Sequence, residues 1–140
     1  MVDREVSPAY VEDAGKRSVK QAFQEQARGI IDCLGAKQEW WAAGWNPPGD
    51  KVDGLAIDAT GRLLVIEVKP GTASTKEFAK APLQVAMYVW WVTKWIEDDP
   101  AHAREVLLGM AGQRTALGLF GNKAPKLGDP IRVVPVIAIG

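Results

Sequence analysis

The chain has 140 residues, and its 17 basic side chains are balanced by 17 acidic ones, so the formal net charge is zero. This length suits a single globular domain spanning residues 1–140, and the balanced charge does not by itself indicate a nucleic-acid partner. The single cysteine, Cys33, excludes an internal disulfide and fits a reducing compartment.

The N-terminal residues and the hydropathy pattern argue against export and against membrane insertion. Residues 1–5 are Met-Val-Asp-Arg-Glu, which are charged and lack the apolar core of a signal peptide. No apolar run approaches the length that crosses a bilayer. We therefore expect a cytoplasmic protein with no membrane partner.

A long helix is predicted over residues 7–34. A serine-proline pair begins it, a glycine follows it, and apolar side chains recur between them with helical spacing. Glu12 falls on the same face as this apolar stripe, which is unusual for a glutamate. Glu25 is the rival acidic residue, but helical spacing turns it towards solvent, and Gly15 leaves the phase of the first turns open.

Strands are predicted after this helix. Residues 37–45 form the first, and the Asn-Pro-Pro-Gly-Asp run behind them is a loop. A β-hairpin follows: Asp53 opens a short apolar strand, Asp-Ala-Thr-Gly is turn chemistry, and residues 63–68 form an aliphatic, β-branched strand. Glu67 interrupts that second strand, and Lys69 ends it.

The hairpin brings together charged side chains that suit a metal ion. Side chains alternate faces along a strand, so Glu67 and Lys69 point the same way, and a paired strand carrying Asp53 lays a second carboxylate near Glu67. Two close carboxylates repel unless a cation lies between them or one is protonated, and hard oxygen ligands suit Mg²⁺ or Mn²⁺. Lys69 is then placed to bind a phosphate or to position a water. The alternative is a buried Glu–Lys pair that merely ends a strand.

These residues resemble a known family. Asp53 followed by Glu-Val-Lys at 67–69 resembles the signature of the PD-(D/E)XK nuclease superfamily, which includes restriction endonucleases, Holliday-junction resolvases and RecB-type exonucleases. The first motif position is Val52 rather than proline, a departure that leaves the aspartate intact. Gln-Val-Ala-Met-Tyr at 84–88 looks like the Q-x-x-x-Y motif of the RecB-like branch. The resemblance covers nearly the whole chain and implies a restriction-endonuclease-like core.

The resemblance also implies an activity: a divalent-metal-dependent DNA nuclease that hydrolyses phosphodiester bonds. Asp53 and Glu67 would ligate Mg²⁺ or Mn²⁺ together with the backbone carbonyl of Val68. Lys69 would orient or deprotonate the attacking water, and Gln84 would support the site.

Further residues are assigned around this centre. Related nucleases often carry an acidic residue on the first helix, so Glu12 is the candidate that would complete the metal shell through water. Lys76 and Lys80 follow the motif and are candidates for contacts with DNA phosphates, with a solvated surface as the alternative. Tyr88 would pack or hydrogen-bond behind the site, and it is also a candidate for contact with nucleic acid.

Two helices and a strand complete the predicted order. One of these helices starts near Pro82 and ends near Glu97. Its stripe of Tyr88, Trp91 and Trp95 is assigned to the core in preference to base stacking. A second helix covers residues 101–117, with Val106, Leu107, Met110 and Leu117 as its apolar anchors.

A loop rich in Gly, Pro and Lys leads to a last strand at 131–139, where Pro135 favours an edge or a bulge. The order α-β-β-β-α-α-β gives a mixed sheet flanked by helices, an α/β fold.

Several questions stay open at this stage. The alternative function is a catalytically silent module of the same fold that binds nucleic acid or takes part in assembly, with an additional domain or partner protein supplying DNA capture. The sequence leaves a homodimer open, as well as residues following Gly140. It does not distinguish single strand, duplex, junction or end as substrate, nor endonuclease from exonuclease, nor a role in DNA repair from other pathways.

Overall fold

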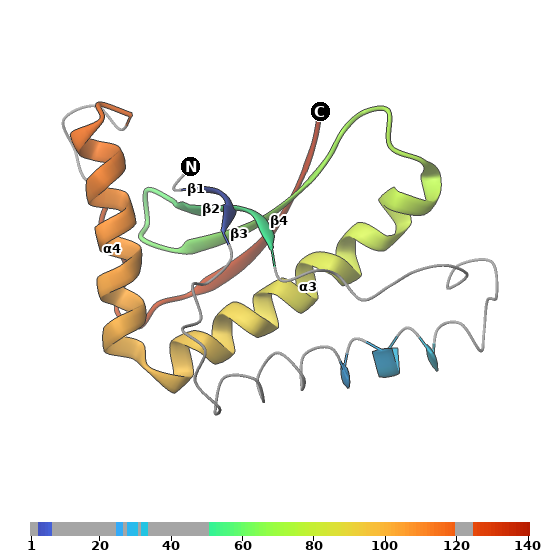
Figure 1. The fold of residues 1–140 in the computed structure, drawn as a ribbon, viewed down its shortest axis with the longest axis horizontal. Coiled ribbons are helices and arrows are strands. Elements are labelled where there is room, and N and C mark those ends of the chain that lie inside the picture. The colour runs from blue at the N-terminus through green and yellow to red at the C-terminus, as the bar shows by residue number, and fades with distance from the viewer. Residues whose placement is uncertain (1–2, 7–24, 27, 31, 34–50, 120–124) are drawn as a thin grey trace.

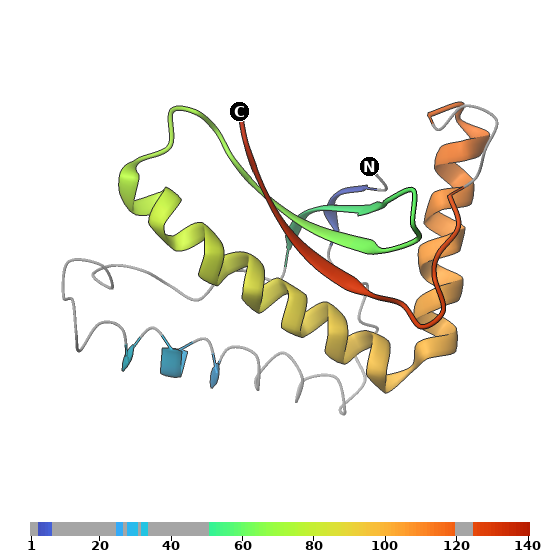
Figure 2. The same cartoon turned by 180° about the vertical axis from the view of Figure 1, so that it is seen from behind.

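The fold is a sheet covered on one face by a long helix, with a second helix beside it (Figures 1 and 2). The computed structural model describes residues 3–6, 25–26, 28–30, 32–33, 51–119 and 125–140. The predicted mixed α/β class is confirmed. No helix within these ranges is both long and apolar enough to cross a membrane.

The four described strands lie in the order of the chain, β1-β2-β3-β4. β1 pairs antiparallel with β2, β2 antiparallel with β3, and β3 parallel with β4. The strands span Asp3–Val6, Val52–Ile57, Leu63–Lys69 and Val133–Ile139. The predicted hairpin is therefore present, and its register sets Leu55 opposite Val65 and Gly54 opposite Ile66.

The predicted order of elements needs one correction at its start. The structure begins with β1, whose Val6 lies opposite Val52, whereas the sequence predicted no strand before the first helix. The four residues of β1 include three charged ones, and they form a strand because β2 offers them a pairing edge. Residues 25–26, 28–30 and 32–33 are helical as predicted, and Glu25 is exposed. The predicted strand at 37–45 and the start of the first helix lie outside the described residues.

Helix α3 spans Thr75–Asp98 and begins seven residues before the predicted start at Pro82. The cause is a capping box, in which the Ser74 hydroxyl accepts from the Glu77 N–H and the Glu77 side chain accepts from the Ser74 N–H. Pro82 lies inside the helix on its exposed side. The missing N–H of Pro82 leaves the carbonyl of Phe78 without its helical donor, and the burial of the opposite face outweighs that loss.

The buried face of α3 forms the core with β2 and β3. Tyr88 and Trp91 are 3% and 2% exposed, so the assignment of the aromatic stripe to the core is confirmed for both. Burying such side chains is the main favourable term in folding. The core also contains aliphatic residues from the helix and both strands: Val52, Leu55, Leu63, Val65, Val85, Val92 and Ile96.

Helix α4 spans Pro100–Ala116 and is capped by Asp99, whose side chain accepts from the His102 N–H. It buries Ala103, Leu107 and Ala111. One predicted anchor is wrong: Leu117 is 71% exposed, because the helix ends at Ala116 and Leu117 lies past the last turn that faces the core.

The β2–β3 turn is tied to the segment that precedes β4. Gly61 has φ +84°, and its carbonyl accepts from the Gly128 N–H at 2.8 Å. The Arg104 guanidinium of α4 donates to the Gly128 carbonyl at 2.6 Å and pairs with Asp129 at 3.2 Å. Residues 125–130 of the predicted loop are therefore bonded to the β2–β3 turn and to α4. A Cβ at Gly61 would lie 2.8 Å from the Gly128 nitrogen.

Pro135 lies on β4, at the edge of the described sheet, as its lack of an N–H predicts. The Leu63 N–H donates to the Arg132 carbonyl, and the Gly140 N–H donates to the Lys69 carbonyl. Between those bonds the parallel pattern directs the even-numbered amides of β4 towards β3. The Pro135 nitrogen therefore faces away from β3, where no bond to that strand is lost.

We predict that Gly61→Ala lowers the free energy of unfolding by about 1–3 kcal/mol, because it adds a Cβ at positive φ against backbone. Gly112→Ala is the matched control: its Cβ meets nothing within 4 Å, and it should raise the stability of α4 by up to about 1 kcal/mol. Urea denaturation measures both. Equal stability of Gly61→Ala and wild type would contradict the close approach of turn and loop.

Candidate functional site

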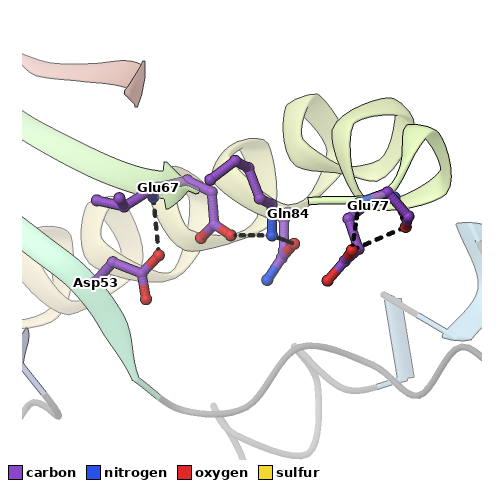
Figure 3. Close-up of polar contacts among 7 residues, drawn as sticks. Asp53, Glu67, Glu77 and Gln84 are labelled. Atoms are coloured by element: carbon purple, nitrogen blue, oxygen red, sulfur yellow. Dashed lines mark hydrogen bonds and ion pairs between the residues drawn. The ribbon is translucent and has the colours of Figure 1, made fainter. Parts of the chain in front are cut away.

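The candidate site lies where the core face of the hairpin changes from apolar to charged (Figure 3). Alternation along β3 places Leu63, Val65, Glu67 and Lys69 on the face that looks towards α3. The antiparallel register continues from the Gly54–Ile66 pair to set Asp53 opposite Glu67. The carboxylates thus prolong the rows of side chains that build the core, so the packing of the core positions them.

Asp53 is held by the neighbouring strand. Its Oδ2 accepts a hydrogen bond from the Val68 N–H at 2.8 Å. This bond fixes the carboxylate beside β3 and directs it towards Glu67, as Figure 3 shows. Asp53 and Glu67 therefore lie opposite each other across the hairpin, as predicted.

Glu67 is almost fully buried, with 1% of its surface exposed. Its Oε2 has no hydrogen-bond partner among the described residues. Burial raises the pKa of Glu67, and the negative charge of Asp53 raises it further, against the opposing effect of the bond from Lys69. A buried acid with an unsatisfied oxygen destabilises the fold, so this carboxylate is an unusual feature for a purely structural residue.

Lys69 connects the hairpin to helix α3. Its ammonium forms an ion pair with Glu67 Oε1 at 2.6 Å and donates to Gln84 Oε1 at 3.0 Å. An ammonium has three donors and no acceptor, so it takes the oxygen end of the Gln84 amide. The NH₂ end of Gln84 is therefore turned away from Lys69.

Glu77 is a neighbour of the site that the sequence analysis did not select. It lies in the first turn of α3, and its carboxylate is on the same side of the helix as the Gln84 amide (Figure 3). The signal was present in the sequence, since Ser74-x-x-Glu77 is the capping-box pattern that places this glutamate at a helix start.

Two further predicted site residues, Lys80 and Tyr88, lie on the buried face of α3. Glu12 lies outside the described residues. Lys80 is buried, with 7% exposed, and Tyr88 lies in the core one turn beyond Gln84. Burial lowers the pKa of Lys80, and the nearby charge of Lys76 lowers it further. Tyr88 has the position of a residue packed behind the site, whereas neither it nor Lys80 offers a surface for phosphate or base contacts.

The donors at the hairpin fit a hard divalent cation. Asp53 and Glu67 supply carboxylate oxygens, one of them buried without a partner, and Val68 supplies a backbone carbonyl at the same strand end. Among the described residues there is no group of three or more His, Cys, Asp or Glu side chains able to share one ion. Two carboxylates are thus the side-chain ligands available here, and water would have to fill further positions.

Comparisons with models of protein families, with curated proteins and with solved structures found no match to this chain.

We predict that Asp53→Asn raises the free energy of unfolding in metal-free buffer by about 1 kcal/mol. The amide can still accept from the Val68 N–H, while its NH₂ replaces carboxylate repulsion with a donor for Glu67 Oε2. Asp53→Ala is the control, because it removes repulsion and hydrogen bond together, and it should be less stable than Asp53→Asn. Urea denaturation at neutral pH measures all three. An Asp53→Asn variant less stable than wild type would show that repulsion between the two carboxylates does not destabilise the fold.

Proposed function

We propose that this chain is a divalent-metal-dependent DNA nuclease of the PD-(D/E)XK type that hydrolyses phosphodiester bonds, with a restriction-endonuclease-like core. The observation that carries the proposal is the buried Glu67, whose Oε2 has no partner among the described residues, facing Asp53 beside Lys69. Two carboxylates and a lysine at one strand end form the constellation that the family motif predicts.

Each residue has a role that follows from its contacts. Asp53 and Glu67 would hold Mg²⁺ or Mn²⁺ with the Val68 carbonyl, and the bound ion would polarise a phosphate oxygen and acidify a water. Lys69 already donates to two acceptors, and its third N–H would be left to bind the water or a phosphate oxygen. Glu12 is proposed to complete the metal shell through water.

The reaction is a displacement at phosphorus. The oxygen of a water forms a bond to phosphorus as the bond to the leaving oxygen breaks. The water gives up a proton to bulk solvent, and the leaving oxygen takes one from bulk solvent. The Lys69 ammonium stabilises the negative charge that builds up on the phosphate oxygens. The NH₂ of Gln84, turned away from Lys69, is a second donor for a phosphate oxygen.

The same proposal names DNA as the partner of the protein. It places the protein in the cytoplasm, without a membrane partner. Lys76 lies one turn before Lys80 on α3. Lys76 is half-buried, whereas Lys80 is buried. Lys76 is thus the better placed of the predicted phosphate contacts. A homodimer or a partner domain would be needed to extend so small a basic surface along a duplex.

The first test is Mn²⁺ titration by calorimetry, followed by a cleavage assay on single-stranded, duplex and branched DNA. Wild type should bind the ion, and Asp53→Ala/Glu67→Ala should neither bind it nor cleave DNA, since both side-chain ligands are gone. Glu105→Ala, which removes an exposed acid on α4, is the control and should behave as wild type. A wild type that binds no Mn²⁺, with or without DNA, would instead favour a silent nuclease-fold module.

A second prediction separates catalysis from metal binding. Gln84→Ala removes an amide that holds Lys69 and faces the site, and we expect cleavage to slow by about 10- to 100-fold. The affinity for Mn²⁺ should stay within about twofold, because Gln84 is not a metal ligand. Gln113→Ala on the exposed side of α4 is the matched control. Loss of Mn²⁺ binding in Gln84→Ala would contradict this division of roles.

A further inference from the structure

Glu77 is an exposed residue in the first turn of α3, on the same helical line as Gln84 and Tyr88. Seven residues separate Glu77 from Gln84, and four more lead to Tyr88, so all three fall on one face of the helix. Gln84 bonds Lys69 and Tyr88 is in the core, which identifies this face as the one turned to the sheet. Figure 3 shows the carboxylates of Glu67 and Glu77 on either side of the Gln84 amide.

The helix cap uses only part of the Glu77 carboxylate. The Ser74 N–H and the Ser74 hydroxyl both donate to Oε2, at 2.7 and 2.8 Å. The second oxygen, Oε1, takes no part in the cap. A glutamine could accept the same bonds, since the capping box is formed by either residue type, but only the carboxylate also gains from its charge at the helix N-terminus. The cap and the helix dipole both favour a negative charge at Glu77, and that charge also acts on Lys69.

Glu67 has two competing partners in the proposed nuclease. Its Oε1 pairs with Lys69 in the structure, and the same carboxylate is needed for the metal. If Glu67 held a cation, the half-buried Lys69 ammonium would lose much of its counter-charge and keep only the neutral Gln84 amide.

We propose that Glu77 is a positioning residue for Lys69, supplying the negative charge that holds the ammonium at the start of α3 while Glu67 binds the metal. The inference rests on the proposed function and deepens it. The affinity for the metal ion would then depend on a residue that touches neither metal nor substrate.

Charge at Glu77 supports this assignment. The bonds from Ser74 lower the pKa of Glu77, and the positive charge of Lys69 lowers it further, so the side chain is ionised at neutral pH. The attraction between Glu77 and Lys69 already acts in the metal-free state, across the first turns of α3.

The test is a double-mutant cycle read by Mn²⁺ calorimetry, with Glu77→Gln, Lys69→Met and both together. Glu77→Gln keeps an acceptor for the cap and removes the charge, so Tm should fall only slightly while Mn²⁺ binds about three- to tenfold more weakly, as expected for one partly screened charge. In the Lys69→Met background the same change should alter the affinity less than about twofold. Glu105→Gln controls for the loss of one surface charge.

Ser74→Ala adds the opposite perturbation. It weakens the cap and keeps the charge of Glu77, so Tm should fall while Mn²⁺ affinity changes less than in Glu77→Gln. Equal weakening in Ser74→Ala would assign the effect to the cap and overturn the inference. So would an effect of Glu77→Gln that persists without Lys69, or no effect at all in a wild type that binds Mn²⁺. A wild type that binds no Mn²⁺ overturns the metal centre itself.

Discussion

The burial of Glu67 at the end of β3 is the constraint on which the rest of the site depends. A carboxylate with 1% of its surface exposed loses most of its hydration, and one oxygen finds no replacement partner among the described residues. The ion pair with Lys69 offsets part of that loss, while Asp53 across the hairpin adds to it. Such an arrangement destabilises the fold in the absence of a ligand, which is typical of sites where function opposes stability.

The core explains how this arrangement is held. Leu55, Leu63 and Val65 are buried under α3, and the acids follow them on the same rows of the hairpin. Because side chains on a strand alternate strictly, a shift of register by one residue would move Glu67 out of the core and bury Ile66 in its place. The hydrogen bond from the Gly128 N–H to the Gly61 carbonyl, at the other end of the hairpin, limits such a shift. The geometry of the site is thus set by contacts far from it.

The hairpin and its acids could be predicted from sequence because their signals are local. A turn composition between two β-branched runs gives the pairing, and a period of two gives the face of Glu67 and Lys69. The edge position of Pro135 followed from its missing N–H. β1 could not be found in this way, since three of its four residues are charged and only the edge of β2 makes them a strand. The bond from Lys69 to Gln84 joins residues 15 apart and depends on where α3 packs.

The start of α3 is where a local signal was misread, and the difference changes the site. Taking Pro82 as the first residue leaves Glu77 in a loop and Gln84 in the first turn. The capping box at Ser74 instead adds two turns of helix before Gln84, which place the exposed Glu77 on the same helical line as Gln84. The same glutamate closes the helix end through its Oε2 and carries a negative charge that acts on Lys69. Fraying of the first turn would weaken the cap and withdraw a charge from Lys69 together, so local helix stability and the electrostatics of the site are coupled through one side chain.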